Sequence, residues 1–170
     1  MQVDFEFGMD TSVILILGSN LGDRFKYLQE ARLHIDETIG SPIIISSIYE
    51  TEPWGFTHEN LFLNQVIQVN TALGPFEVLD KIQKIETKLG RERGNERYTA
   101  RTIDIDILFY DDLIINTPKL TIPHIEMSGR RFVLEPLAEI VPMMVHPVYL
   151  KTVRELLTEC EDRCKVRIAK

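Results

Sequence analysis

Two aspartates separated by one residue, Asp104 and Asp106, alternate with the isoleucines Ile103, Ile105 and Ile107. In a β-strand successive side chains point to opposite faces, so both carboxylates would lie on one face and the isoleucines on the other. The two aspartate Cα atoms would be about 6.5 Å apart, twice the rise per residue. This pair predicts a site for Mg²⁺, which binds proteins through a few carboxylates together with substrate phosphates. A strand with one solvent-facing side has the same pattern, so the neighbouring segments must decide between the two interpretations.

The segment before this strand, residues 91–101, is polar and rich in arginine, and it contains Arg91, Arg93, Arg97 and Arg101. Guanidinium groups bind phosphate through paired hydrogen bonds and stay charged, so they can stabilise the charge that shifts during phosphoryl transfer. The alternative is a solvated run of charges in which these arginines pair with the two glutamates of the segment. Because the segment leads directly into the paired aspartates, we favour phosphate binding. We also expect the segment to be mobile without ligand and to close over bound ligands.

A second basic group follows later in the chain. His124 comes directly after Pro123, and Arg130 and Arg131 follow shortly after it. The histidine could donate a hydrogen bond to a phosphate while the arginines add positive charge.

Aromatic side chains flank these polar segments: Trp54, Phe56, Phe62, Tyr98 and Phe132. Two of them could stack on the faces of a flat heterocycle while the amide of Asn64 binds its edge. For any single aromatic residue, packing in the core is the alternative.

Composition excludes several other classes of protein. The net charge of −7 disfavours non-specific binding to nucleic acid or to an anionic membrane. No apolar run approaches the roughly 20 residues of a membrane span, and the acidic first residues are unlike a secretion signal, so we expect a cytoplasmic protein. The sequence lacks a P-loop motif, and the glycines after Leu17 do not form a dinucleotide fingerprint, so an ATP site would be of another kind. We interpret Gly18 as a tight exit from the first strand.

Hydrophobic periodicity and turn residues predict the elements that would position these groups. Strands are expected at residues 12–17, 43–51, 62–71 and 102–110, and helices at 23–39, 75–89 and 130–134, with a last helix that starts at Thr152 and includes Cys160 and Cys164. The order β-α-β-β-α-β, followed by a hairpin and helices, predicts an α+β fold with a ferredoxin-like antiparallel sheet covered by helices. We expect one domain over residues 11–170 and a flexible N-terminal extension at residues 1–10.

Several motifs occur together and in one order: LGSNLGDR, SSIYETEPWG, FLNQV, IETKLGRER, RTIDIDILFY and LTIPHIEMSGRRFVLEPLAEI. With these motifs, which run roughly from Leu17 to Ile140, the chain resembles the 6-hydroxymethyl-7,8-dihydropterin pyrophosphokinases of folate biosynthesis. The resemblance implies transfer of pyrophosphate from ATP to the hydroxymethyl group of the dihydropterin, giving the pterin diphosphate and AMP. It also implies two Mg²⁺ ions, with ATP as co-substrate.

The resemblance further implies roles for the matching positions. Asp104 and Asp106 would hold the two Mg²⁺ ions, and the phosphates would be served by Arg91, Arg93 and Arg101. The nucleotide site would also include Gln83, Glu86, Arg97, Ile107, Thr121, His124 and Arg130. The pterin pocket would be lined by Thr51, Trp54, Phe62, Asn64, Tyr98 and Phe132.

The chain departs from the family pattern at three positions. Tyr98 stands where some members carry tryptophan, Ile125 where some carry tyrosine, and Lys119 where an arginine lies beside the nucleotide. Tyr98 keeps a face for stacking, whereas Ile125 cannot donate a hydroxyl hydrogen bond to ATP.

Two functions of other kinds stay open. A pterin or nucleotide binder without activity would keep the pocket, although the intact aspartates disfavour it. A metal-dependent nuclease would use the same aspartates on a phosphodiester, but the acidic chain lacks a broad basic groove. We expect a monomer whose partners are ATP and the dihydropterin, with no nucleic acid or membrane partner.

Overall fold

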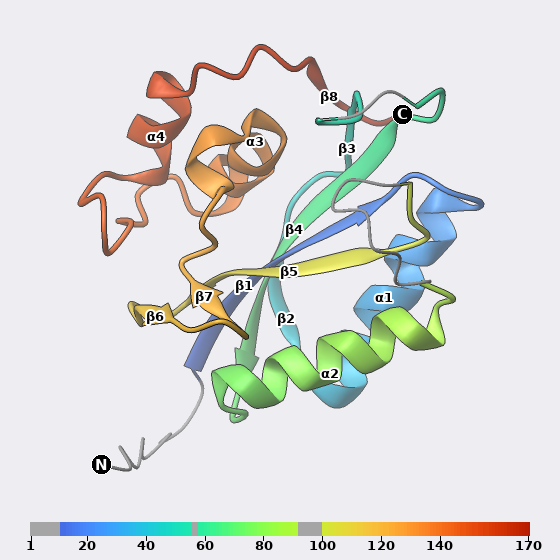
Figure 1. The fold of residues 1–170 in the computed structure, drawn as a ribbon, viewed down its shortest axis with the longest axis horizontal. Coiled ribbons are helices and arrows are strands. Elements are labelled where there is room, and N and C mark those ends of the chain that lie inside the picture. Colours follow the sequence, from blue (N-terminus) through green and yellow to red (C-terminus); the bar gives the residue numbers. More distant parts are fainter. Residues whose placement is uncertain (1–10, 56–57, 92–99) are drawn as a thin grey trace.

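The computed structural model describes residues 11–55, 58–91 and 100–170, and Figure 1 shows how its elements are arranged. The strands of the main sheet are β1 (Thr11–Ser19), β2 (Pro42–Ile45), β3 (Tyr49–Thr51), β4 (Phe62–Thr71), β5 (Asp104–Tyr110) and β8 (Val166–Ile168). The helices are α1 (Arg24–Thr38), α2 (Pro75–Lys88), α3 (Arg131–Ile140) and α4 (Val153–Glu159). A small hairpin of β6 (Ile115–Asn116) and β7 (Thr121–Ile122) follows β5, and a 3-10 turn, Met127–Gly129, precedes α3.

The main sheet is antiparallel, with the strand order β5-β1-β4-β3-β8 and with β2 paired to β4 beside β3. Strand β1 pairs with β4 along its whole length, from Thr11 opposite Thr71 to Ser19 opposite Leu63. Because α1 follows β1 and α2 joins β4 to β5, this is the strand order of a ferredoxin-like sheet. The predicted fold class is therefore confirmed.

Helices cover both faces of this sheet. Helices α1 and α2 pack on one face and α3 and α4 on the other, as Figure 1 shows. Along β1, Leu15 and Leu17 belong to the first of these two cores, whereas Ile14 and Ile16 belong to the second. A strand that is buried on both faces needs apolar residues at every position, which explains the uninterrupted apolar run of β1.

The buried face of α1 begins later than the apolar residues of the helix. Phe25 lies one turn before Leu28 in their repeat, but it is 45% exposed, and the buried residues of α1 start at Leu28. Asp23 caps the helix by accepting a hydrogen bond from the Lys26 amide at 3.1 Å, so Phe25 lies in the first turn.

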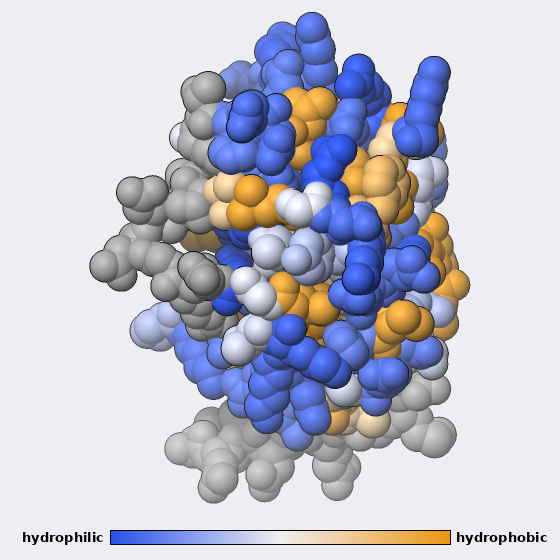
Figure 2. Space-filling view, turned by 90° about the vertical axis from the view of Figure 1, so that its right-hand side faces the viewer, coloured by the Kyte–Doolittle hydropathy of each residue, from blue (hydrophilic) through white to orange (hydrophobic). Residues whose placement is uncertain are grey.

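Figure 2 shows that the side of the molecule at the right of Figure 1 is largely hydrophilic, with separate hydrophobic spots. In the described part of the chain, no helix combines the length and apolar character that crossing a membrane requires.

The expected strand at residues 43–51 is divided into β2 and β3. Between them, the Ser46 hydroxyl accepts a hydrogen bond from the Val66 amide at 3.0 Å, and the Ser46 amide donates to the Val66 carbonyl at 2.9 Å. A side chain thus replaces a main-chain partner at this point, which interrupts the regular ladder.

The C-terminal region differs most from the prediction. Helix α3 does not stop at Leu134 but continues through Pro136 to Ile140. Helix α4 begins after Thr152 as expected but ends at Glu159, so Cys160 terminates the helix and Cys164 lies beyond it, contrary to the prediction. The sequence did not indicate β8, which pairs with β3. A three-residue strand has too little periodicity to be recognised without its partner.

The buried sheet gives a direct test of the packing. Ile67 in β4 is fully buried, whereas Ile43 in β2 is 51% exposed. We expect Ile67→Ala to lower the free energy of unfolding by about 2–5 kcal/mol, because it leaves a cavity in the core. The control Ile43→Ala should cost less than about 1 kcal/mol. Urea denaturation followed by circular dichroism measures both, and equal losses would contradict the described core.

Candidate active site

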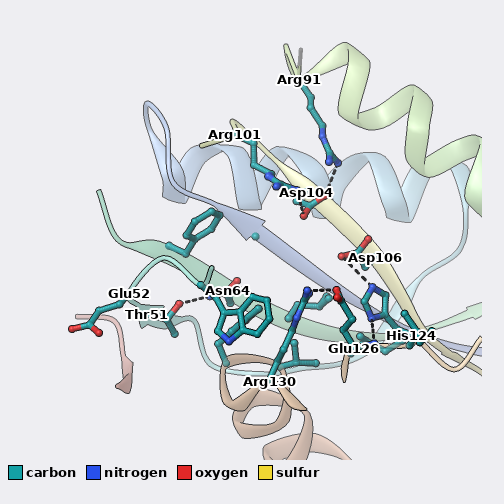
Figure 3. Close-up of a pocket in the computed structure, with 18 residues that line it drawn as sticks. Thr51, Glu52, Asn64, Arg91, Arg101, Asp104, Asp106, His124, Glu126 and Arg130 are labelled. Atoms are coloured by element: carbon teal, nitrogen blue, oxygen red, sulfur yellow. Dashed lines mark hydrogen bonds and ion pairs between the residues drawn. The ribbon is translucent and has the colours of Figure 1, made fainter. Parts of the chain in front are cut away.

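A cavity of about 320 Å³ opens where β1, β4 and β5 approach the start of α3. It is lined from the four strands β1, β3, β4 and β5, from the β3–β4 and α2–β5 connections, from the segment between β7 and α3, and from the start of α3. The lining residues that carry polar or aromatic groups are Thr51, Glu52, Trp54, Phe62, Asn64, Arg91, Arg101, Asp104, Asp106, His124, Glu126, Arg130 and Phe132. Figure 3 shows that they approach the cavity from elements far apart in the sequence.

The two aspartates lie on one face of β5, as the alternation predicted. Both line the cavity, and their side chains are 24% and 42% exposed for Asp104 and Asp106 respectively. The intervening Ile105 and the flanking isoleucines are buried in the core under α1 and α2. The strand therefore delivers two carboxylates to the cavity while its other face anchors the sheet.

Two arginines hold Asp104. Arg91 approaches one carboxylate oxygen at 2.5 Å, and Arg101 approaches the other at 2.6 Å. Burial alone would lower the pKa of Arg91, but the negative charges of Asp104, Glu86 and Asp106 raise it, so this guanidinium stays charged. Asp104 is thus bound on both oxygens by groups that also suit a phosphate.

Glu86 of α2 holds Arg91 and the main chain of β5 in this arrangement. Its side chain is 5% exposed, it forms an ion pair with Arg91, and it accepts a hydrogen bond from the Ile105 amide at 2.9 Å. On the other side, Asn20 is fully buried, and its side chain accepts from the Arg101 amide at 2.8 Å. Both arginines next to Asp104 are therefore positioned by buried polar groups.

Asp106 has a different environment. Its pKa is raised, first by the desolvation that its depth in the protein brings and then by the negative charges of Asp104 and Glu86. The open part of its side chain faces the cavity, where water moderates that desolvation. The Nε2 atom of His124 lies 3.9 Å from its carboxylate. The His124 amide donates to the Leu108 carbonyl at 3.0 Å, which places the imidazole beside β5.

The carboxylates of Asp104 and Asp106 suit a hard cation that also keeps ligands from outside the protein. Among the described residues, no group of three or more histidine, cysteine or acidic side chains forms a complete metal site. Two carboxylates on one strand face instead provide part of a coordination sphere, which is how Mg²⁺ is bound when phosphates and water complete it. A cation beside Asp104 and Asp106 would also relieve the repulsion that raises the pKa of Asp106.

The far half of the cavity is built around a buried amide. Asn64 is 3% exposed, and its Nδ2 donates to the Thr51 hydroxyl at 2.9 Å. Gly18 lies opposite Asn64 in β1, and a Cβ atom there would come within 3.1 Å of the Asn64 Oδ1 atom. Gly18 is thus part of the strand and not its exit turn as predicted, and its missing side chain makes room for Asn64.

Aromatic rings and one more arginine line this half. The Arg130 guanidinium carbon lies 4.5 Å from the centre of the Trp54 ring and 5.8 Å from that of Phe132, distances suited to cation–π contact. Arg130 also forms an ion pair with Glu126. Phe62 lines the same half.

The structure brings together most of the residues that the sequence singled out. Arg91, Arg101, Asp104, Asp106, His124, Arg130, Thr51, Trp54, Phe62, Asn64 and Phe132 all line the cavity. Glu86 supports it through Arg91, as described above.

Other predicted positions lie apart from the lining or outside the described residues. Gln83, Ile107 and Thr121 do not line the cavity, and Ile107 packs in the core on the opposite face of β5. Lys119 forms an ion pair with Asp80 at 3.2 Å, and Ile125 lies at the cavity rim. Arg93, Arg97, Tyr98 and Phe56 lie outside the described residues, as does most of the segment expected to move.

Sequence reasoning missed Asn20, Gly18, Glu52 and Glu126. A glycine inside a strand pattern signals a close approach of other groups, so Gly18 could have been recognised. Asn20 and Glu126 act through partners distant in the chain or across a turn, and no local pattern marks them.

Comparisons with known proteins agree on one family. A family model described as 7,8-dihydro-6-hydroxymethylpterin-pyrophosphokinase matches residues 14–142. The chain is 41% identical over 148 residues to a 2-amino-4-hydroxy-6-hydroxymethyldihydropteridine pyrophosphokinase of Aquifex aeolicus, covering 87% of this chain and 91% of that protein. It is 43% identical over 133 residues to the Bacillus subtilis protein of the same name, covering 78% and 79%. A crystal structure of Plasmodium falciparum HPPK-DHPS resembles it with a TM-score of 0.74 at 20% identity, over 91% of this chain and 45% of that chain, which concerns the fold alone.

The role of Glu86 in the site can be tested through stability. We expect Glu86→Ala to lower the free energy of unfolding by about 1–3 kcal/mol, because it leaves the Ile105 amide without its acceptor and Arg91 without one partner. Glu86→Gln keeps an acceptor and should cost less. Glu30→Ala on α1 is the control, since the Glu30 carboxylate lies 3.9 Å from the exposed Lys26. Losses that are equal for Glu86→Ala and the control, measured by urea denaturation, would refute this role.

Proposed function

The chain belongs to the 7,8-dihydro-6-hydroxymethylpterin-pyrophosphokinase family, and we propose that the cavity described above is its active site. There the pyrophosphoryl group of ATP would pass to the hydroxymethyl group of 6-hydroxymethyl-7,8-dihydropterin, giving the pterin diphosphate and AMP. This is a step of folate biosynthesis. The observation that carries the proposal is that one cavity has two chemically different halves, one of opposed charges and one of a buried amide with aromatic rings.

The charged half suits a triphosphate. Arg91, Arg101 and His124 supply positive charge or hydrogen-bond donors around the two carboxylates of β5. Guanidinium groups that now bind Asp104 can turn to phosphate oxygens when a cation takes over the carboxylate. Bound Mg²⁺ would neutralise phosphate charge here, and we propose Asp104 and Asp106 as the residues that hold two such ions.

The other half suits a pterin ring. Asn64 offers both a donor and an acceptor in a buried position, and Thr51 fixes the orientation of its amide. Phe62 and Phe132 supply flat faces for stacking, while Trp54 holds Arg130 at the junction of the two halves. A bicyclic heterocycle with polar edges fits this combination better than an aliphatic substrate.

The reaction needs positioning more than covalent chemistry. The hydroxymethyl oxygen of the pterin attacks the β-phosphorus of ATP in line, the bond from that phosphorus to the oxygen shared with the α-phosphorus breaks, and AMP leaves. Asn64 and the aromatic rings would hold the attacking oxygen about 3–3.5 Å from phosphorus. Arg91 and Arg101 would stabilise the negative charge that develops on the phosphate oxygens.

The remaining predicted contacts stay proposals. Arg93, Arg97 and Tyr98 would approach the nucleotide and pterin from the segment that links α2 to β5. Gln83 and Thr121 would contact the nucleotide from beside the cavity, and Ile107 could do so only through its main chain. A monomeric, cytoplasmic enzyme remains the expectation.

The nature of the nucleotide product tests the proposed reaction. The purified protein incubated with 6-hydroxymethyl-7,8-dihydropterin, ATP and Mg²⁺ should give AMP and the pterin diphosphate in equal amounts. Chelation of Mg²⁺ should stop the reaction. ADP with a pterin monophosphate would overturn the proposal, and no pterin-dependent consumption of ATP would favour a binder without activity. Cleavage of a nucleic acid would favour the nuclease.

The two aspartates should be essential for turnover but not for folding. We expect Asp104→Asn or Asp106→Asn to lower kcat at least 10²-fold, about 2.7 kcal/mol in the barrier, because each removes a charge that would bind the metal. Circular dichroism should show an unchanged fold, since both side chains face the cavity. Asp80→Asn, on the exposed side of α2, is the control and should keep full activity. A folded double variant of Asp104 and Asp106 with near-normal kcat would rule out their metal-binding role.

A further inference from the structure

The chain beyond α4, which we call the C-terminal strap (residues 161–169), lies outside the residues that the family model matches. In Figure 1 it leaves α4, passes over α3 and ends beside β3. It therefore contacts two elements that carry the pterin half of the cavity. Its own side chains are largely exposed, so it adds little to the core.

The first contact is with the start of α3. The N-cap residue of this helix is Arg130, and its side chain makes no capping hydrogen bond. Instead, the Asp162 carboxylate accepts a hydrogen bond from the Arg131 amide at 2.9 Å, and the Asp162 carbonyl accepts one from the Arg131 Nε atom, also at 2.9 Å. Arg131 lies between Arg130 and Phe132, which both line the cavity. Asp162 thus caps the helix from a distant part of the chain and fixes the main chain that carries both side chains.

The second contact is with β3. Strand β8 pairs with it so that Val166 lies opposite Thr51, whose hydroxyl accepts the hydrogen bond from Asn64. Next to this pair, Arg167 contacts Glu50 at 2.7 Å, and its hydrogen bond is the main reason why the pKa of Glu50 is lowered. Because Arg167 is 71% exposed, solvent screens this ion pair, and the main-chain ladder is the stronger link.

Glu50 extends the second contact to the next strand. Its other oxygen lies 3.3 Å from Arg24 of α1, and the same Arg24 nitrogen donates to the Leu61 carbonyl at 2.8 Å. Leu61 directly precedes Phe62 of the cavity wall. One end of the strap is therefore linked to Arg130 and Phe132, and the other to Thr51 and Phe62.

We propose that the strap is a positioning element that holds the two walls of the pterin half at a fixed separation, with Asp162 and Arg167 as positioning residues. The inference rests on the proposed function, because it concerns binding of the pterin at that same site. Neither residue touches the cavity, so both act through Arg131 and β3. Loss of the strap contacts should weaken pterin binding more than ATP binding and leave kcat nearly unchanged.

The test compares three variants of neighbouring acids in steady-state kinetics. Asp162→Ala removes the cap of α3 and should raise the KM for the dihydropterin about 5-fold, the equivalent of a cap worth about 1 kcal/mol. Asp162→Asn keeps an oxygen that can cap the helix and should stay within about 2-fold of the wild type. Glu161→Ala, at an exposed neighbouring position, is the control and should change nothing. In all three variants kcat should stay within about 2-fold of the wild type, and the KM for ATP should change less than the KM for the dihydropterin.

Fluorescence provides a second measurement that does not depend on turnover. Trp54 is the only tryptophan and lies against Arg130, so its fluorescence reports on this half of the cavity. Asp162→Ala should shift the emission and weaken the binding of 6-hydroxymethylpterin, titrated with Mg²⁺ and a non-hydrolysable ATP analogue. Arg167 is too exposed for its loss to prevent folding, and Arg167→Ala should weaken pterin binding by a smaller factor than Asp162→Ala.

The outcomes separate this inference from the proposed function. If the wild type forms AMP but folded Asp162→Ala keeps the wild-type pterin KM and the wild-type Trp54 emission, the strap inference is overturned and the function stands. A parallel rise in the KM values for ATP and pterin would also overturn it, because that indicates general loosening. If the wild type forms no AMP, the proposed function fails, and the Trp54 emission of Asp162→Ala without ligand still decides whether the strap holds the cavity walls.

Discussion

The balance of charge around the start of β5 is the constraint on which the site depends. Asp104, Asp106 and Glu86 would repel one another, and Arg91 and Arg101 compensate by binding Asp104 on both oxygens. The pKa of Asp106 is raised first by desolvation and then by the negative charges of Asp104 and Glu86, which Arg91 and Arg101 offset only in part. Among the described residues the carboxylate charge of this open site is only partly balanced, which suits a cation that arrives with a phosphate ligand. Until such a cation binds, the fold has to hold these like charges close together.

The sheet meets this constraint by placing the two halves of the cavity on neighbouring strands. In β1, Gly18 lies between Asn64 of β4 and Asp104 of β5 in the strand registers. The absence of a side chain there leaves space for the Asn64 amide and joins the pterin half to the charged half. The other face of the same strands is packed against α1 and α2. The rigid packing on this face thus allows the opposite face to hold the carboxylates of Asp104 and Asp106 close together.

The sequence predicted what depends on local pattern and missed what depends on distant partners. Alternation in β5 predicted correctly that Asp104 and Asp106 share a face, and the order of elements predicted the ferredoxin-like sheet. Strand β8 and the contact of Asp162 with Arg131 could not be predicted, because each involves residues far apart in sequence and leaves no periodic signal. The role of Gly18 was misjudged because the glycine stood next to residues typical of a turn.

The most direct test of the account is the position of metal at β5. Crystals grown with Mn²⁺ in place of Mg²⁺, a non-hydrolysable ATP analogue and 6-hydroxymethylpterin would locate the ions by anomalous scattering. The account predicts two peaks, each within about 2–2.5 Å of a carboxylate oxygen of Asp104 or Asp106, with Arg91 or Arg101 turned toward phosphate oxygens. Well-occupied Mn²⁺ peaks bound to the nucleotide but distant from both aspartates would contradict it.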